Sequence, residues 1–166
     1  CMEKVVSLSQ LDLVNGVYSY ADYLTWQFEQ TVELIKGKIF PMSAPSRKHQ
    51  AISRELNGLF YLHFKNHPCE FYAAPFDVRL YDKRKSAKAN KDVYTVVQPD
   101  ICIVCDENKL DVQGCNGAPD LIVEILSPAT QKNDLGKKKD VYEKFGVKEY
   151  WTINPKDKAT IVRYLD

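Results

Sequence analysis

Two apolar runs of strand length each carry a carboxylate that a buried strand does not need. The first reads QPDICIVCD over residues 98–106, and the second reads PDLIVEILSP over residues 119–128. If the runs pair as a fully overlapped antiparallel hairpin, Asp100 lies opposite Glu124, and the two acids share one face because side chains alternate along a strand. Facing carboxylates repel each other, so a hard divalent cation with oxygen ligands is expected between them.

The same two acids also allow a purely structural interpretation. Asp100 directly follows Pro99 and could belong to a Pro-Asp turn, while Glu124 could simply pair with a lysine. The strand pattern alone does not separate this interpretation from a metal site.

The length and composition indicate one globular domain. The chain has 166 residues, of which 45% are hydrophobic and 27% are charged, as in an ordinary soluble domain. We expect a single domain over residues 1–166, with an N-terminal extension at residues 1–17 and a last strand that continues in the natural chain beyond residue 166. No apolar run approaches the roughly 20 residues of a membrane helix and no signal sequence is recognisable, so we expect no membrane association and a cytoplasmic location.

The charge balance offers no whole-domain argument for nucleic-acid binding. The net charge is +1, whereas obvious nucleic-acid binders tend to be basic as whole domains. The clearest basic cluster is the loop over residues 82–92, which is either a solvated hairpin tip or a contact to phosphates. Its cationic residues are Lys83, Arg84, Lys85, Lys88 and Lys91.

The five cysteines do not suggest a metal or disulfide framework. Their number is odd, and Cys102 and Cys105 lie on opposite faces of the expected strand, which argues against a CxxC zinc or redox pair. We therefore expect reduced, partly buried thiols.

A β-hairpin is predicted over residues 31–42. The segments VELI and KIF flank Lys36 and Gly37, and glycine supplies the positive φ of a tight turn. Within the hairpin, Glu33 shares a strand face with Ile35. Its carboxylate is either a solvated edge residue or a further acid that reaches the metal site.

A helix is predicted from Ser46 to about Phe64, because apolar residues recur there at steps of three and four. Its expected buried stripe consists of His49, Ile52, Leu56, Leu59, Phe60 and His63. His49 thus lies on the inner face of the first turn. It is either a core or capping histidine, or a residue that contacts the substrate or supports the metal ligands.

A further strand is predicted over residues 70–81, and it carries another acid, Asp77. The carboxylate of Asp77 could bond a neighbouring backbone group instead of a metal. We therefore rank Asp77 below Asp100 as a candidate ligand.

A lysine is expected on the inner face of a later helix. Asp134 is predicted as the N-cap of this helix, which ends near Phe145. Lys138 falls on the same stripe as Val141 and Tyr142, since these residues are three and four positions apart. An ammonium on that face needs a partner, because burying it unpaired is unfavourable.

The position of this helix brings the lysine towards the two acids. The connection from the second acidic run to the strand expected at residues 149–153 has the length of a βαβ crossover, which makes those strands parallel. The helix then begins near Glu124, and Lys138 can approach both Glu124 and Asp100.

Two carboxylates and a lysine around one point suit metal-assisted hydrolysis of a phosphodiester. Asp100 and Glu124 would hold Mg²⁺ or Mn²⁺, which polarises a phosphoryl oxygen and activates water. Lys138 would orient that water or stabilise the developing charge.

The order of elements resembles the PD-(D/E)XK restriction-endonuclease-like superfamily, and five segments resemble, more narrowly, the bacterial Uma-type endonuclease family. The segments are VELIKGKI, PFDVRL, QPDICIVCD, PDLIVEILSP and GVKEYWTINP, within a match from about Tyr20 to Asp166. The resemblance implies an α/β fold with a restriction-endonuclease-like core, a central mixed β-sheet flanked by helices and an N-terminal β-hairpin.

The resemblance also implies roles for individual residues, with Asp100 as the PD acid and Glu124 as the second acid. The sequence departs from the superfamily pattern two residues after Glu124, where Leu126 stands in place of a lysine. In the Uma-type pattern the lysine lies on the following helix, and Lys138 is the position that matches.

Two further residues match the family motifs. Glu33 corresponds to the acid of the YELI-type motif, and His49 corresponds to the helical histidine. The expected catalytic residues are therefore Asp100, Glu124, Lys138, Glu33 and His49, with Asp100 and Glu124 as the metal ligands.

Three hypotheses for the function follow. The first is a metal-dependent nuclease that acts on DNA, with nucleic acid as its partner and a homodimer as a possible assembly, because cutting two strands calls for two sites. The second is a catalytically degenerate module of the same fold that binds nucleic acid or protein. The third is an unrelated domain whose acids are structural. Metal binding and cleavage by the protein and its site variants separate the three.

Overall fold

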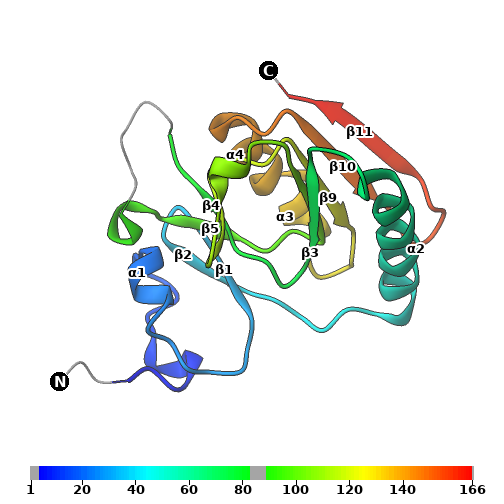
Figure 1. The fold of residues 1–166 in the computed structure, drawn as a ribbon. Helices are drawn as coiled ribbons and strands as arrows, with labels where there is room; N and C mark the ends of the chain where they lie inside the picture. The colour runs from blue at the N-terminus through cyan, green and yellow to red at the C-terminus, as the bar shows by residue number, and fades with distance from the viewer. Residues whose placement is uncertain (1–3, 83–88, 166) are drawn as a thin grey trace.

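A computed structural model describes residues 4–82 and 89–165 of the chain (Figure 1). Its helices are α1 (Tyr20–Tyr23), α2 (Arg47–Phe64), α3 (Gln131–Leu135) and α4 (Lys137–Phe145), with short 3₁₀ turns at Leu8–Gln10, Asn90–Asp92 and Glu107–Lys109.

The strands of the described residues form two mixed sheets. The six-stranded sheet has the order β2 (Lys38–Pro41), β1 (Val32–Ile35), β5 (Thr95–Val97), β4 (Val78–Leu80), β8 (Gly114–Asn116) and β7 (Leu110–Asp111). The five-stranded sheet has the order β11 (Thr160–Tyr164), β10 (Glu149–Ile153), β9 (Leu121–Ile125), β6 (Ile101–Val104) and β3 (Glu70–Ala73). The predicted α/β class is confirmed, with the strands divided between two sheets instead of gathered in one.

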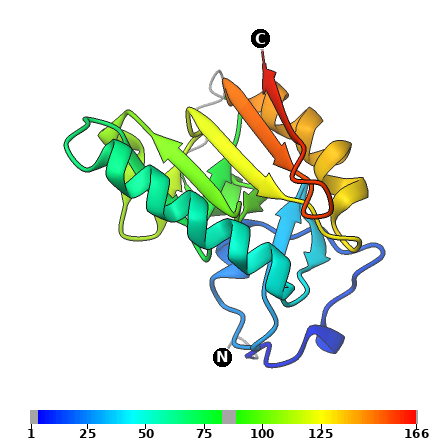
Figure 2. The ribbon, with the colours of Figure 1, turned by 90° about the vertical axis from the view of Figure 1, so that its right-hand side faces the viewer.

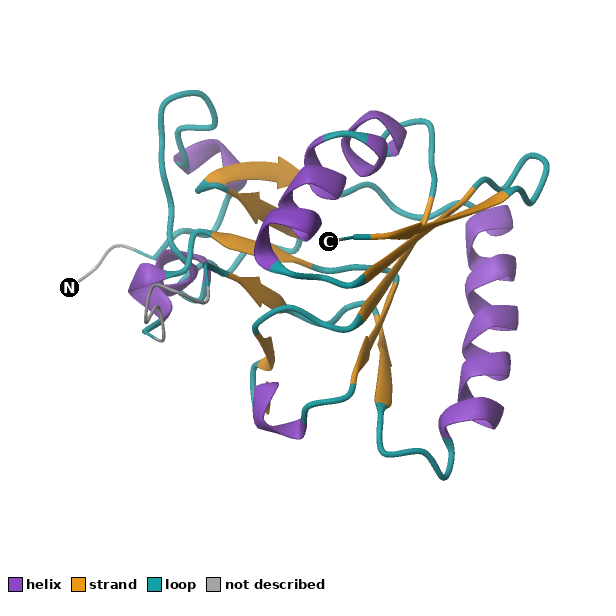
Figure 3. Ribbon diagram, turned by 90° about the horizontal axis from the view of Figure 1, so that it is seen from above, coloured by secondary structure: helices purple, strands orange, loops and turns teal. Residues whose placement is uncertain are grey.

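Helices cover both faces of the five-stranded sheet. Helix α2 lies across one face, and α3 and α4 lie on the other (Figures 2 and 3). Ile52, Leu56 and Phe60 of α2 pack against apolar side chains of β6 and β9. Val141 and Tyr142 of α4 pack into the core cluster on the opposite face. This layered arrangement brings side chains from α2 and α4 to the same end of β6 and β9.

Helix α2 has nearly the predicted bounds, but its buried face is narrower than predicted. Leu59 is 63% exposed, and His63 is also exposed. The buried face follows the four-residue steps of Ile52, Leu56 and Phe60, which keep one line along the helix. The assignment of Leu59 and His63 to the buried stripe was therefore wrong.

The register of β6 and β9 is the predicted one. The strands are antiparallel, with Ile101 opposite Val123. One further step of this register places Asp100 opposite Glu124. Strand β10 pairs with β9 in parallel, as the crossover argument predicted.

The predicted hairpin is confirmed as β1 and β2, which pair antiparallel around Lys36 and Gly37. Both turn residues have positive φ, 52° and 78°, as a two-residue hairpin turn requires. Strand β1 is not at the sheet edge, because β5 pairs with it on the other side. Glu33 is consequently only 4% exposed, which excludes the solvated edge residue that the sequence allowed.

The strand predicted over residues 70–81 is divided into β3 and β4, which belong to different sheets. Strand β3 pairs with β6, while β4 pairs with β5 and β8. Pro75 lies in the segment between them and has no N–H for a continuous ladder. This division leaves Asp77 beside the six-stranded sheet.

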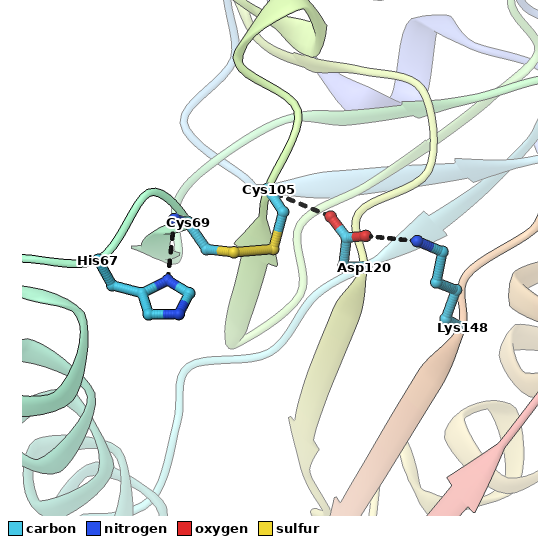
Figure 4. Close-up of a disulfide and its surroundings, with 5 residues drawn as sticks. All are labelled: His67, Cys69, Cys105, Asp120 and Lys148. Carbon is cyan, nitrogen blue, oxygen red and sulfur yellow. Dashed lines mark hydrogen bonds and ion pairs between the residues drawn. A yellow bond between two sulfur atoms is a disulfide. The ribbon is translucent and has the colours of Figure 1, made fainter.

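The expectation of reduced thiols was wrong for one pair of cysteines. Cys69 and Cys105 form a disulfide (Figure 4). Cys102 and Cys115 are free and buried. Strand β3 pairs with β6 so that Glu70 lies opposite Val104, and one step outward brings Cys69 opposite Cys105. The bond joins the end of this strand pair that lies away from Asp100.

The segment predicted as an N-terminal extension contacts the rest of the protein where it is described. Leu8 and Leu11 pack against the cluster that contains Tyr20 and Leu34. In the part of the chain that the structure describes, no helix is long and apolar enough to cross a membrane.

Candidate active site

One cavity of about 740 Å³ contains all five predicted catalytic residues in its lining. Asp100 precedes β6, Glu124 lies in β9, Glu33 in β1, His49 in the first turn of α2 and Lys138 in α4. These residues come from both sheets and from both helical layers. The structure therefore brings together residues that are up to 105 positions apart in the sequence, from 33 to 138.

Lys138 lies at the centre of a group of carboxylates. Its Nζ atom is 2.9 Å from Oε1 of Glu124, 3.0 Å from Oε2 of Glu33 and 3.4 Å from Oδ1 of Asp134. The whole residue is only 5% exposed. Burial alone would lower the pKa of Lys138, but the three carboxylates outweigh burial and raise this pKa well above its ordinary value. The lysine is therefore a charged donor in this site.

Negative charge is in excess around this ammonium. Burial raises the pKa of Glu124 well above its ordinary value; Lys138 opposes the rise, and Asp134, Asp100 and Glu33 add to it. Burial likewise raises the pKa of Asp134, against the effect of Lys138. One ammonium therefore does not compensate the acids of this cavity.

Tyr142 is a site residue that was not predicted. Its hydroxyl donates to Oε1 of Glu124 at 2.8 Å, the same oxygen that Lys138 contacts. Neither donor uses the other carboxylate oxygen, Oε2. The signal was present in the sequence, because Tyr142 lies four residues after Lys138 on the stripe that we assigned only to packing.

Replacing Tyr142 with phenylalanine should weaken the site without removing its charges. We expect a loss of about 1.5–3 kcal/mol in the free energy of unfolding, because a hydrogen bond to a charged acceptor disappears. If the site is the nuclease site that the sequence predicts, cleavage should fall by about 10–100-fold, as for other residues that orient a metal ligand. Urea unfolding and initial cleavage rates measure the two effects. Tyr20→Phe is the matched control, since Tyr20 is buried and donates to Asp77 outside this cavity; an equal loss of cleavage there would contradict the orienting role.

Asp100 is held by the neighbouring strand and by α2. Its Oδ2 atom accepts a hydrogen bond from the backbone N–H of Ile125 at 2.7 Å and lies 3.2 Å from Nε2 of His49. This hydrogen bond to Asp100 is the largest cause that raises the pKa of His49. Both contacts use Oδ2, so they fix the carboxylate while leaving Oδ1 for another role. The ring of His49 therefore contacts the predicted ligand Asp100 and does not cap the helix.

Glu33 connects β1 to the segment after β5 and to α4. Its Oε1 atom accepts from the backbone N–H of Gln98 at 2.8 Å, and its Oε2 atom pairs with Lys138. Both oxygens contact protein donors, so Glu33 reaches the site through the lysine.

Asp77 lies outside this cavity and is joined to it through Gln98, which contacts both Asp77 and Glu33. Asp77 accepts hydrogen bonds from the hydroxyls of Tyr20 and Tyr23 and from the side-chain amide of Gln98. It does not line the cavity of the five predicted residues. Its ranking below Asp100 agrees with these contacts.

Asp134 is not the helix cap that the sequence predicted. It lies inside α3, whereas α4 begins at Lys137 after Gly136, which provides no side-chain cap. The side chain of Asp134 lines the cavity instead. The cap prediction failed because the helical pattern did not indicate the break at Gly136.

The free carboxylate oxygens of this cavity suit a cation that also binds water or substrate oxygens. Among the five predicted residues, Asp100 and Glu124 are the acids with an oxygen that the contacts above do not use. Mg²⁺ is commonly held by one or two carboxylates with water and substrate phosphates. Among the described residues, no group of three or more His, Cys, Asp or Glu is arranged as a complete metal cluster. A cation at Asp100 and Glu124 would therefore need further oxygen ligands from water or substrate. Most of the predicted basic loop, residues 83–88, lies outside the described residues.

The protein is similar to several known proteins. A solved structure from Anabaena variabilis, described as a putative nuclease, aligns with a TM-score of 0.67 and 22% identity over 89% of this chain and 79% of that one. An uncharacterized protein from Synechocystis is 30% identical over 123 residues, 73% of this chain, and the alignment covers 60% of that relative's length. Residues 20–165 match the Uma2 family, which is described as "Putative restriction endonuclease". Because this match spans nearly the whole chain, the protein belongs to the Uma2 family of restriction-endonuclease-like proteins.

Proposed function

We propose that the protein is a metal-dependent nuclease that hydrolyses phosphodiester bonds in DNA, with Asp100 and Glu124 as the ligands of Mg²⁺ or Mn²⁺. The observation that carries the proposal is the excess of buried carboxylates over one ammonium in a cavity open to substrate. Buried acids in such excess call for a cation. Membership of the Uma2 family, described as "Putative restriction endonuclease", supports the same reaction class.

The cation would supply Lewis-acid activation of the phosphodiester and of the attacking water. Asp100 is suited to bind it because the backbone N–H of Ile125 and the ring of His49 hold its carboxylate in one orientation. Glu124 is suited because Lys138 and Tyr142 both donate to its Oε1. The protein thereby pre-orients two ligand oxygens before substrate arrives.

Lys138 is protonated and can therefore donate hydrogen bonds. The three carboxylates around it favour the ammonium, so it would stabilise negative charge that develops on the phosphate or orient the attacking water through its N–H groups. It would not act as the general base, because a base must be able to give up its proton near the working pH. The proposal includes DNA as the substrate, which the cleavage products test. It also includes a homodimer that cuts two strands, which the mass of the complex tests.

A catalytically degenerate binding module is the second candidate, and one sequence feature favours it. Leu126 occupies the strand position where the superfamily pattern has a lysine. The contact of Lys138 with Glu124 at 2.9 Å favours the nuclease, because it places an ammonium beside the second acid from another element.

The proposed function is tested by cleavage of plasmid DNA, single-stranded DNA and RNA with Mn²⁺ or Mg²⁺ present. We expect DNA cleavage by the wild type and a loss of at least about 100-fold in Asp100→Asn, since a neutral amide is a poor ligand. Asp77→Asn is the matched control, because Asp77 is fully engaged outside the cavity.

Two outcomes would contradict the nuclease. Cleavage that survives in Asp100→Asn and in Glu124→Ala would remove the proposed site. A folded wild type that binds no Mn²⁺ and cuts none of the three substrates would favour the binding module.

A further inference from the structure

The ammonium of Lys138 is held from three directions. Its partners are Glu124 in β9, Glu33 in β1 and Asp134 in α3. An ammonium has three N–H donors, so each carboxylate can face one of them. Glu124 and Glu33 correspond to motif acids, whereas Asp134 has no role in the function proposed above.

The burial and the contacts of Asp134 indicate that its carboxylate acts on Lys138. Asp134 is 1% exposed, and its Oδ1 atom has no hydrogen-bond partner among the described residues. Nζ of Lys138 lies 3.4 Å from this oxygen. Burial raises the pKa of Asp134, although Lys138 and a hydrogen bond with Thr130 both lower it, so the fold would be easier to build with an uncharged side chain here. Because this buried carboxylate caps no helix and burial disfavours its charge, we look for its role in the active site.

The backbone of Asp134 is fixed independently of its side chain. Its N–H donates to the carbonyl of Thr130, the N-cap of α3, and its carbonyl accepts from the hydroxyl of Tyr150 at 2.8 Å. The carboxylate is thus presented to Lys138 from a rigid position. Asp134 can thereby restrict the side chain of Lys138, whose four-carbon stem is otherwise flexible.

We propose that Asp134 is a positioning residue of the active site, which holds the ammonium of Lys138 against Oε1 of Glu124 and acts on the chemistry only through that lysine. The inference rests on the proposed function. With Lys138 and Tyr142 both fixed at Oε1, the carboxylate of Glu124 cannot rotate freely, and Oε2 remains the oxygen for a cation. We expect Asp134 to serve the lysine and not to bind the cation, since its Oδ1 contacts the ammonium.

Helix α4, which carries Lys138, also provides a matched control pair. Lys139 and Glu143 are also four residues apart and 3.4 Å from each other, but their side chains are 33% and 46% exposed. Glu143→Gln therefore removes the same kind of charge at the same distance and spacing, in solvent. Asp134→Asn and Glu143→Gln should differ in every property that depends on a buried anchor.

The first measurement uses the metal-free protein and does not need activity. Side-chain ¹⁵N NMR detects a lysine ammonium when its hydrogens exchange slowly with water. We expect a slowly exchanging signal from Lys138 in the wild type and in Glu143→Gln. In Asp134→Asn the exchange should accelerate until the signal broadens or disappears, with Lys138→Met as the assignment control.

The second measurement separates positioning from metal binding. Asp134→Asn should lower kcat by about 10–100-fold, as for other residues that orient a catalytic group, with KM changed by less than about twofold. Its Mn²⁺ affinity by calorimetry should stay within about tenfold of the wild type. Glu143→Gln should match the wild type in all three quantities.

Three results would overturn the proposal. An unchanged Lys138 signal in Asp134→Asn would show that the lysine does not depend on this anchor. Loss of Mn²⁺ binding as complete as in Glu124→Gln would make Asp134 a ligand. Loss of the fold in both Asp134→Asn and Asp134→Ser would make the residue part of the structural core. If even the wild type cuts nothing, the proposed function fails, but the NMR comparison still decides whether Asp134 holds Lys138.

Discussion

Replacing Glu124 with glutamine is expected to abolish metal binding and cleavage while leaving the metal-free protein at least as stable as the wild type. Burial raises the pKa of Glu124, which means that its charged form is unfavourable in this site. Glutamine has nearly the same shape and carries no charge, and Lys138 keeps Glu33 and Asp134 as partners. The substitution therefore removes a ligand and an unfavourable charge together.

Thermal unfolding with and without Mn²⁺ measures both effects. At a hundredfold excess over Kd, a cation that binds only the folded wild type adds about 2.7 kcal/mol. For a chain of this length, such a gain raises Tm by roughly 5–10 °C. We expect no such rise in Glu124→Gln, and cleavage reduced by at least about 1000-fold.

Glu33→Gln is the matched control for this experiment. Glu33 and Glu124 are both 4% exposed, and both contact Lys138 at about the same distance, 3.0 and 2.9 Å. Both oxygens of Glu33 have protein partners, so its neutral variant should keep the Mn²⁺-induced rise in Tm. An equal loss of that rise in both variants would contradict the assignment of Glu124 as the ligand. So would a Glu124→Gln protein that still responds to Mn²⁺.

The pairing of the two acids was predictable because it depends on local spacing. Asp100 and Glu124 are placed symmetrically about the segment that connects β6 to β9, and strand alternation fixes their common face. The position of Lys138 followed from helical periodicity and the crossover between β9 and β10. Each of these arguments uses residues that are close in sequence.

The features that the sequence did not predict depend on pairing between distant segments. Glu33 is buried because β5 pairs with β1, and its strand pattern alone does not show that neighbour. Cys69 meets Cys105 because β3 pairs with β6 across 36 residues of sequence. Asp134 was misread because an acid before a helical pattern normally indicates a cap, and only the break at Gly136 turns its side chain into the cavity.

Replacing Lys138 with methionine should be the most destabilising of the site substitutions in the metal-free protein. Methionine fills the stem of the lysine but leaves Glu33, Glu124 and Asp134 buried together without their ammonium. Removing one partner of a buried ion pair typically lowers the free energy of unfolding by about 3–5 kcal/mol. This corresponds to a Tm lower by roughly 6–20 °C. Lys139→Met, at the exposed pair with Glu143, should change the free energy of unfolding by no more than about 0.5 kcal/mol.

The same substitution should separate metal binding from catalysis. Without the ammonium, the carboxylates attract a divalent cation more strongly, so Lys138→Met should bind Mn²⁺ at least as tightly as the wild type and regain part of its lost stability when Mn²⁺ is added. Cleavage should nevertheless fall by about 100–1000-fold, because the donor to the developing charge is gone. Calorimetry, thermal unfolding and cleavage rates on one protein sample test the three statements together. Weaker Mn²⁺ binding than in the wild type would mean that Lys138 holds the ligands in place more than it repels the cation, and near-normal cleavage would exclude the lysine from the chemistry.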